Sequence, residues 1–325
     1  MNNNKIKIGI AGLGTVGSGV INLLEKNKVE ILKRSGFEIS IVCVSASNKD
    51  KKRNCNIEGL SFYTNPLEMI RNESIDILIE LIGGESLAKE LVIEALKKKI
   101  HVVTANKALI ALHGNEISEI SNKEGCDVAY EASVAGAVPI IKVIRESLNA
   151  NEIEWIAGII NGTTNYILTE MLKSKKDFND VLKEAQELGY AEADPAFDVG
   201  GIDAAHKLTI LASICFGIPL NFESIYIEGI ESIELDDLNY AKELGYAIKH
   251  LAIGRKNKDG IELRVHSCLI PKTRLIANVD GVKNAVVVSS DAAGPTLYYG
   301  AGAGSLATAS SVVSDIIDIS RKILS

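Results

Sequence analysis

The feature that most constrains this fold is a glycine-rich turn that directly follows an apolar segment near the N-terminus. The pattern of residues 6–11 predicts a buried strand, and Gly12-Leu-Gly14-Thr-Val-Gly17 follows at once. Apolar residues then recur at helical spacing, at Val16, Val20, Leu23, Leu24 and Ile31. A buried strand, a glycine turn and a helix in this order are typical of the first βα unit of a dinucleotide-binding sheet.

Each glycine has a physical reason in such a site. Gly12 allows the tight turn, Gly14 leaves no side chain between the backbone and a pyrophosphate, and Gly17 lets the helix pack closely on the strand. Thr15 and Val16 stand at the helix start, where unpaired N–H groups and the helix dipole favour phosphate. The alternative is a glycine turn with a purely structural role.

The rest of the chain predicts a two-domain α/β protein. Strands are expected over residues 37–44, 75–82, 101–105 and 128–131, and helices over 86–99 and 109–123. This alternation predicts a Rossmann-type parallel sheet domain over residues 1–133, completed by a C-terminal helix within 301–325. Residues 134–300 predict an α+β substrate-binding and dimerisation domain with a mixed sheet. Its expected elements are helices over 140–148, 167–174 and 178–188, and strands over 225–230, 252–255, 261–269 and 285–289.

Two positions at expected strand ends are candidates for the cofactor site. Lys107 follows a strand in Thr-Ala-Asn-Lys, at a carboxyl end, where ligands bind in parallel sheets. An ordinary helix-start lysine is the alternative.

Ser45 closes the second strand, where an NAD-preferring site usually has an acid. Ser47 and a basic run (Lys49, Lys51, Lys52, Arg53) follow instead, which favours NADP, with NAD or a merely solvated loop as alternatives.

An acidic segment that leads to one lysine predicts a polar pocket. Glu192, Asp194 and Asp198 lie in a turn-rich stretch, and Asp203 and Lys207 stand at positions i and i+4 of an expected helix. This arrangement suits a small cationic, hydroxylated molecule. The alternative is a helix start with a solvated ion pair.

Composition excludes several other classes of function. The net charge is −7 and no basic stripe is present, so nucleic acid is not an expected partner. No apolar run reaches the length of a membrane span. The five cysteines contain no Cys-x-x-Cys pair, which favours a reducing cytoplasm and argues against a zinc site.

Over essentially its whole length, the chain resembles the homoserine dehydrogenase family. The specific parts are Gly-Leu-Gly-Thr-Val-Gly, Thr-Ala-Asn-Lys, Tyr-Glu-Ala-Ser-Val-Ala-Gly, Asn-Gly-Thr-Thr-Asn-Tyr, Glu-Ala-Asp-Pro…Asp…Gly-Ile-Asp-Ala-Ala-His-Lys and Gly-Ala-Gly-Ala-Gly. The resemblance is to the short form without a regulatory domain. It implies NAD(P)-dependent interconversion of L-homoserine and L-aspartate 4-semialdehyde, toward threonine and methionine.

The resemblance also implies roles for particular residues. Lys207 would be the acid/base at the reacting oxygen, Lys107 would lie at the nicotinamide end, and Asp203 would position Lys207 or the substrate hydroxyl. Glu192 and Asp198 would hold the substrate amine, for which Glu192 has the alternative of an exposed turn acid. The remaining implied contacts are the substrate site (Gly162, Thr163, Tyr190) and the cofactor contact Gly304.

Two further expectations come from the same resemblance. A sodium ion would be held by the side chain of Glu131 and the main-chain carbonyls of Val134, Gly136 and Val138. Two copies of the chain would form a homodimer through the second domain's sheet. Three rivals remain at this point: another dehydrogenase of the same two-domain shape, a cofactor-sensing binding module, and a structural subunit with a vestigial site.

Overall fold

The computed structural model describes residues 5–325, and its contacts divide the chain into two compact units. The first unit runs to Ala137 and resumes over Ala303–Ser325, and the second unit is Val138–Gly302. The predicted domain boundaries lay after residues 133 and 300. Among the described residues, no helix combines the length and apolarity needed to cross a bilayer.

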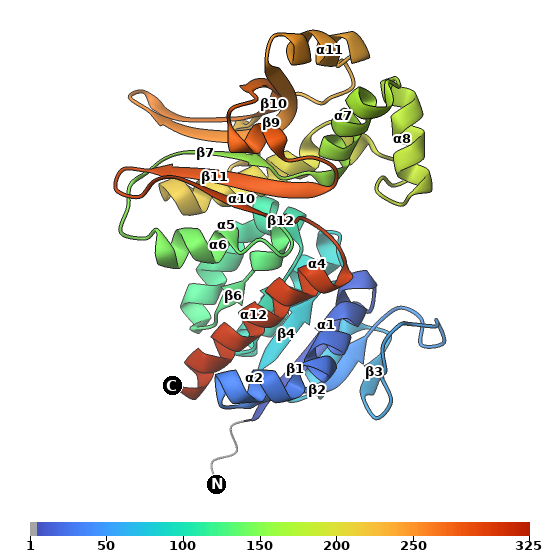
Figure 1. The fold of residues 1–325 in the computed structure, drawn as a ribbon. Coiled ribbons are helices and arrows are strands. Elements are labelled where there is room, and N and C mark those ends of the chain that lie inside the picture. The colour runs from blue at the N-terminus through green and yellow to red at the C-terminus, as the bar shows by residue number, and fades with distance from the viewer. Residues whose placement is uncertain (1–4) are drawn as a thin grey trace. The chain divides into compact units, whose positions relative to one another are not determined.

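The first unit is built on a six-stranded parallel sheet of Rossmann type, which confirms the predicted fold class (Figure 1). Its strand order is β3-β2-β1-β4-β5-β6. The strands are β1 (Lys5–Ala11), β2 (Glu38–Ser45), β3 (Ser61–Tyr63), β4 (Ile77–Glu80), β5 (His101–Thr104) and β6 (Val128–Ala129). The short edge strand β3 was not predicted, because three residues carry too little periodicity to show a pattern.

Helices cover both faces of this sheet. One apolar cluster joins the sheet to α1 (Thr15–Lys26) and α12 (Ser305–Leu324), which lie side by side. The other face packs against α3 (Pro66–Asn72), α4 (Ser86–Lys97) and α5 (Lys107–Glu124). Because strand side chains alternate, Ile77 and Ile79 belong to the first cluster and Leu78 to the second.

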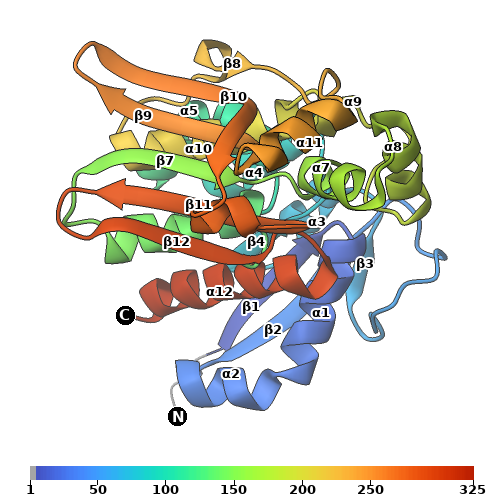
Figure 2. The ribbon, with the colours of Figure 1, turned by 45° about the horizontal axis from the view of Figure 1, so that its top comes forward.

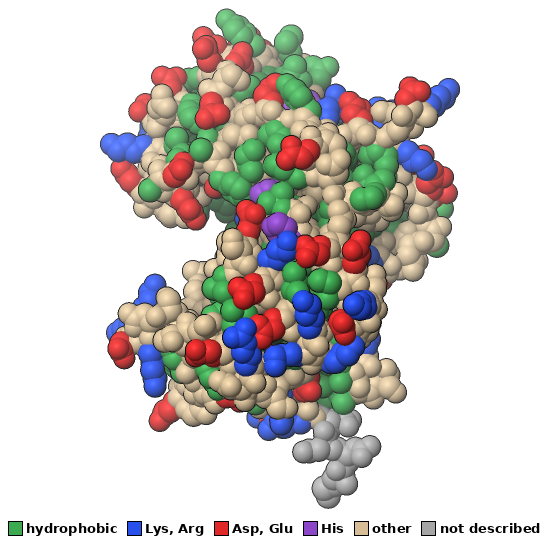
Figure 3. All heavy atoms as spheres, turned by 180° about the vertical axis from the view of Figure 1, so that it is seen from behind, with side chains coloured by type: hydrophobic (Ala, Val, Ile, Leu, Met, Phe, Trp, Pro, Cys, Tyr) green, Lys and Arg blue, Asp and Glu red, His purple; other side chains and the backbone are tan. Residues whose placement is uncertain are grey.

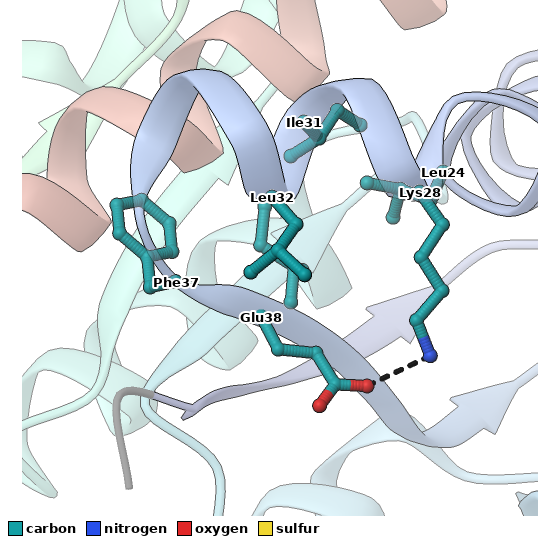
Figure 4. Close-up of a pocket in the computed structure, with 7 residues that line it drawn as sticks. Leu24, Lys28, Ile31, Leu32, Phe37 and Glu38 are labelled. Carbon is teal, nitrogen blue, oxygen red and sulfur yellow. Dashed lines mark ion pairs between the residues drawn. The ribbon is translucent and has the colours of Figure 1, made fainter. Parts of the chain in front are cut away.

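The helical pattern after the glycine turn forms two helices instead of one. α1 ends at Lys26, and α2 (Lys28–Ser35) begins after Asn27, whose backbone leaves the helical region at φ −105° and ψ 15°. Ile31 therefore belongs to α2. Figure 4 shows Lys28 of α2 paired at 2.8 Å with Glu38 of β2, beside the apolar side chains of Leu32 and Phe37. This ion pair lowers the pKa of Glu38.

The second unit contains the predicted mixed sheet, in the order β12-β11-β7-β9-β10-β8. Every neighbouring pair is antiparallel except β10 and β8, which are parallel. The long hairpin of β9 and β10 is its most extended part (Figure 2). The strands are β7 (Ile153–Ile159), β8 (Tyr226–Ile227), β9 (Tyr246–Asn257), β10 (Gly260–Pro271), β11 (Lys283–Ser290) and β12 (Gly294–Ala301).

One face of this sheet is covered by α10 (Ile202–Phe216), whose Phe216 packs close to Gly254. A separate apolar cluster joins α7 (Gly162–Ser174), α8 (Phe178–Glu187) and α11 (Leu235–Glu243). The other sheet face carries apolar side chains that are only partly buried, at Ala157, Ile253, Val287 and Leu297. The 3₁₀ turn η4 (Leu275–Asn278) packs on part of that face.

Several predicted boundaries in the second unit were wrong. α7 begins at Gly162, not near residue 167, because Asn161 caps it directly. The expected helix over 140–148 is α6 (Ile140–Lys142) followed by a π-helical segment, η2 (Val143–Ser147). β12 and α11 were not predicted. The remaining short elements are η1 (Glu131–Ser133), α9 (Ala196–Val199) and η3 (Phe222–Ser224).

Charged side chains of both signs are intermixed on the face shown in Figure 3. Several of them pair between neighbouring helices, as Arg71 of α3 does with Glu94 of α4 at 2.7 Å. Lys89 of α4 likewise pairs with Glu116 of α5 at 2.7 Å. Such exposed pairs contribute little to stability, so the apolar clusters carry the fold.

The contact between α1 and α12 depends on Gly19, which yields a first prediction. A Cβ at Gly19 would lie 2.5 Å from the Ser305 hydroxyl oxygen and 2.7 Å from the Ser305 carbonyl oxygen. Gly19→Val should therefore lower the free energy of unfolding by about 1–3 kcal/mol through overpacking, measured by denaturant titration. Lys26→Ala, at the exposed end of the same helix, is the control. Unchanged stability of Gly19→Val would contradict this packing.

Candidate active site

The glycine turn after β1 forms an open cradle at the start of α1. Gly12 has φ +104°, and a Cβ there would lie 2.3 Å from the carbonyl oxygen of Leu81. A Cβ at Gly17 would lie 2.0 Å from the carbonyl oxygen of Gly12, whereas a Cβ at Gly14 would meet no atom within 4 Å. Packing thus requires glycine at 12 and 17, and Gly14 faces open space. The residues present fit a dinucleotide pyrophosphate at this helix start.

The segment before α12 also lies at this cradle. Gly304 has φ +119° and caps α12, and the Ser305 hydroxyl donates a 2.7 Å hydrogen bond to the carbonyl of Thr15. The first turn of α1 contains no acidic residue. The structure therefore places Gly304, which the resemblance implied as a cofactor contact, near Thr15 at the predicted phosphate-binding helix start. The cofactor role of these residues stays a prediction.

The basic run after β2 is folded against an aromatic ring. Arg53 donates to the carbonyls of Lys49 (3.1 Å) and Lys51 (2.8 Å) and to that of Asn48. Its guanidinium carbon lies 5.7 Å from the centre of the Phe62 ring. Arg53 thus organises the loop, while Ser47, Lys49, Lys51 and Lys52 are exposed. Ser45 itself is buried, and its carbonyl accepts a 2.9 Å hydrogen bond from the Gly12 N–H.

The carboxyl ends of β4 and β5 hold a buried acid that sequence reasoning missed. Glu80 is 0% exposed and accepts hydrogen bonds from the Thr104 hydroxyl (2.6 Å) and the Ile82 N–H (2.9 Å). Burial raises the pKa of Glu80, while these hydrogen bonds act in the opposite direction. Asn106 caps α5, whose first residue is Lys107. An acid at the end of an apolar strand was the available signal.

In the second unit, Asp203 and Lys207 form a buried ion pair. The Lys207 ammonium lies 2.7 Å from Asp203 Oδ2, and it also donates a 2.7 Å hydrogen bond to the carbonyl of Ile160. The two side chains are only 12% and 5% exposed. The pair is therefore not the solvated surface pair that was the alternative. Removing either partner would leave a buried charge behind.

Asn161 links this pair to a further acid. Its side-chain N–H groups donate to Asp198 Oδ1 (2.8 Å) and to Asp203 Oδ2 (2.9 Å). Its oxygen accepts a 2.8 Å hydrogen bond from the N–H of Thr164, and this capping begins α7. Sequence reasoning assigned Asn161 no role in the site. It missed that one capping amide reaches two acids distant in sequence.

Two of the other predicted substrate residues, Thr163 and Tyr190, lie beside this cluster. The Thr163 hydroxyl donates to the carbonyl of Tyr190 at 2.7 Å and lies 3.5 Å from Asp198 Oδ2. A Cβ at Gly162 would lie 2.9 Å from the carbonyl oxygen of Val282, so glycine is required there. Glu192 is exposed in the turn between α8 and α9, and its role as an amine ligand stays a prediction.

The predicted sodium ligands offer oxygen donors. Glu131 is 1% exposed, the carbonyl of Gly136 accepts a 2.6 Å hydrogen bond from Ser311, and that of Val138 accepts one of 2.8 Å from the Ile140 N–H. A carbonyl oxygen has a second lone pair, so these bonds do not prevent coordination. Within residues 5–325, no cluster of three His, Cys, Asp or Glu side chains suits a metal.

His206, next to Lys207, has a structural environment. It is 5% exposed, and its ring lies 5.5 Å from that of Phe197 and 4.6 Å from that of Phe222, centre to centre. Adjacent residues of an α-helix point about a quarter-turn apart, so His206 and Lys207 face different sides of α10. Lys107 and Lys207 belong to different units of the chain.

Two family models match the chain. "Homoserine dehydrogenase, NAD binding domain" matches residues 12–131, and "Homoserine dehydrogenase" matches residues 139–317. The homoserine dehydrogenase of Pseudomonas aeruginosa is 56% identical over 320 residues, which are 98% of this chain and 73% of that protein.

Solved structures agree with these matches. A homoserine dehydrogenase from Thiobacillus denitrificans has 56% sequence identity and a TM-score of 0.95, over 98% of this chain and 74% of that chain. A hyperthermophilic archaeal homoserine dehydrogenase in complex with NADPH has 27% identity and a TM-score of 0.83, over 98% of each chain.

The open space at Gly14 yields a second prediction. Its backbone (φ −77°, ψ −158°) is extended and accessible to alanine. Gly14→Ala should leave the free energy of unfolding within about 0.5 kcal/mol of the parent. It should weaken dinucleotide binding by about tenfold, or ~1.4 kcal/mol, because the methyl group occupies the pyrophosphate's approach. Fluorescence titration with NADPH measures the affinity.

Gly12→Ala is the matched comparison for this experiment. Its positive φ and its contact with the Leu81 carbonyl make alanine strained there. It should lower the free energy of unfolding by roughly 1–3 kcal/mol. If Gly14→Ala binds NADPH as tightly as the parent, the cradle is not the pyrophosphate site.

Proposed function

Because the chain belongs to the homoserine dehydrogenase family, we propose that Lys207 is the acid/base residue of its reaction. The protein is an NAD(P)-dependent oxidoreductase that interconverts L-homoserine and L-aspartate 4-semialdehyde. We place this step on the route toward threonine and methionine. The observation that carries the role of Lys207 is its buried ion pair with Asp203.

The ion pair suits Lys207 for handling one proton. An ammonium has three N–H donors, and two of those of Lys207 are directed to Asp203 and to the Ile160 carbonyl. The third is available to the reacting oxygen of the substrate. When semialdehyde is reduced, negative charge grows on its carbonyl oxygen, which the ammonium stabilises and then protonates. When homoserine is oxidised, the neutral amine takes the hydroxyl proton.

The bound nicotinamide cofactor supplies or accepts the hydride, and the protein aligns the reactants. Asp203 fixes the position of the Lys207 side chain through a 2.7 Å contact. Lys107 begins α5 at the carboxyl edge of the first sheet. We assign it to the nicotinamide end of the cofactor, as the family resemblance implies.

We assign the substrate amine to Asp198 and Glu192, and the substrate carboxylate to the start of α7. Asp198 is already oriented by the amide of Asn161. The N–H of Thr164 is occupied by the same side chain, so the carboxylate is left with the N–H groups of Gly162 and Thr163. A helix start favours an anion through its dipole and its N–H groups.

NADP is the proposed cofactor. No acid ends β2, and Ser47, Lys49, Lys51 and Lys52 present hydroxyl and ammonium groups where a 2′-phosphate would lie. The archaeal relative of solved structure was described in complex with NADPH. Initial rates with NADPH and NADH, each at limiting concentration, test the preference. A higher kcat/KM with NADH would reverse it.

A sodium site and a homodimer complete the proposal. We assign a sodium ion to the buried carboxylate of Glu131 and the carbonyls of Val134, Gly136 and Val138, because oxygen donors suit a hard cation. A gain in the free energy of unfolding with sodium chloride, but not with choline chloride, tests this assignment.

The partly buried apolar sheet face (Ala157, Ile253, Val287, Leu297) is the proposed dimer surface. The molar mass from light scattering tests it. The free cysteines support a cytoplasmic location.

A third prediction tests the role of Lys207. Lys207→Met removes the acid/base group and should lower kcat by at least about 10²-fold, the usual range for general acid–base catalysis. NADPH affinity, measured by fluorescence titration, should stay unchanged because the cradle lies in the first unit. Lys183→Met, an exposed lysine on α8, is the matched control and should keep full turnover. Near-normal turnover of Lys207→Met would show that another group handles the proton.

A further inference from the structure

The buried carboxylate of Glu80 accepts hydrogen bonds from two turns of the first unit, one of which packs on a third loop. Its Oε2 accepts a 2.6 Å hydrogen bond from the Thr104 hydroxyl, and its Oε1 accepts those of the N–H groups of Ile82 (2.9 Å) and Gly83 (3.3 Å). The Asn106 amide adds a further interaction. All four donors are uncharged, so Glu80 acts as an acceptor for loop ends and not as half of an ion pair.

These bonds fix the two turns at the ends of β4 and β5. Gly83 and Gly84 both have left-handed backbones, at φ 72° and 70°, and fixing a glycine backbone costs more conformational entropy than fixing that of any other residue. Glu80 holds the front of this turn through the N–H of Gly83, and the Asn106 side chain holds its end through the Gly84 carbonyl at 2.6 Å. The Thr104 hydroxyl also accepts a 2.9 Å hydrogen bond from the Asn106 N–H.

The third loop is the glycine turn of the cradle. A Cβ at Gly12 would lie 2.3 Å from the Leu81 carbonyl oxygen and 2.9 Å from the Ile82 nitrogen. The segment that Glu80 holds therefore packs directly on the cradle. On its other side, Asn106 is followed by Lys107, the first residue of α5. All of these groups lie at the carboxyl edge of the sheet, where a dinucleotide binds.

We propose that Glu80 is a positioning residue of the dehydrogenase, which sets the cofactor cradle and the start of α5 without itself contacting substrate. A carboxylate suits this task because both of its oxygens accept hydrogen bonds, so one group satisfies donors from both turns. Glutamine keeps one acceptor oxygen but has an NH₂ donor in place of the other. The Thr104 hydroxyl can rotate to accept from that donor, whereas the backbone N–H groups of Ile82 and Gly83 can only donate. Alanine loses every bond.

The test compares Glu80→Ala and Glu80→Gln with Glu119→Ala, an exposed acid on α5. NADPH affinity by fluorescence titration, kcat, the KM for homoserine and the melting temperature are measured for each. Glu80→Ala should raise the Kd for NADPH and lower kcat, each by about tenfold or more, because misplaced reacting groups lose rate steeply. Glu80→Gln should recover most of both losses. The KM for homoserine should stay within about twofold, since the proposed substrate residues lie in the second unit.

A purely structural role predicts a different pattern. In that case Glu80→Ala would melt at a lower temperature, but its folded fraction would bind NADPH and turn over normally, which would overturn the proposal. If Glu80→Ala does not fold, Thr104→Val removes the hydroxyl bridge without leaving a cavity and should raise the Kd by about threefold or more. An unchanged Kd there would also overturn it.

The inference rests on the proposed function only for the role of Lys107. Its NADPH-binding arm is independent of the role of Lys207. Normal turnover in Lys207→Met together with weakened NADPH binding in Glu80→Ala would refute the acid/base assignment and leave the positioning role intact.

Discussion

The site depends on one buried ion pair, between Lys207 and Asp203. A charged pair away from water is stable only when its geometry is good and its remaining hydrogen-bonding capacity is satisfied. Here the Ile160 carbonyl and the Asn161 amide meet that requirement. Because Asn161 also caps α7 and orients Asp198, the helix start and two acids are tied to the same lysine. The side chains of Asn161, Asp198, Asp203 and Lys207 are therefore linked by hydrogen bonds. A change in one of them alters the positions of the others.

Sequence patterns predicted the elements whose cause is local. The glycine turn, the parallel strands and the i,i+4 relation of Asp203 and Lys207 all follow from short-range spacing. The short β3 and strand β12 depend on neighbouring strands that no local pattern records. The same is true of Glu80 and Asn161, whose importance comes from the residues they meet across the chain. An acid at the end of an apolar strand marks Glu80 as unusual, but the partners of neither residue can be read from its own sequence neighbourhood.

The candidate site of the first unit is formed mainly by backbone, and that of the second unit mainly by side chains. The cofactor cradle of the first unit depends on glycines that have no side chain. Gly12 and Gly17 allow close packing of the backbone, and Gly14 leaves open space. The proposed substrate cluster of the second unit is built from side chains that bind one another. Such preorganised polar groups lose little free energy to rearrangement when charge develops in a reaction. The proposed role of Glu80 would bring the same principle to the first unit.

The return of α12 to the first unit also has a consequence for biosynthesis. Its side chains Val312 and Ile316 cover the sheet face to which Ile8 and Ile10 of β1 contribute. These two residues of α12 are translated only after the entire second unit. On the ribosome, the earliest strands therefore wait with one apolar face unsealed while the intervening residues emerge. During that interval the nascent chain is open to aggregation and is a natural client for chaperones that shield apolar surface.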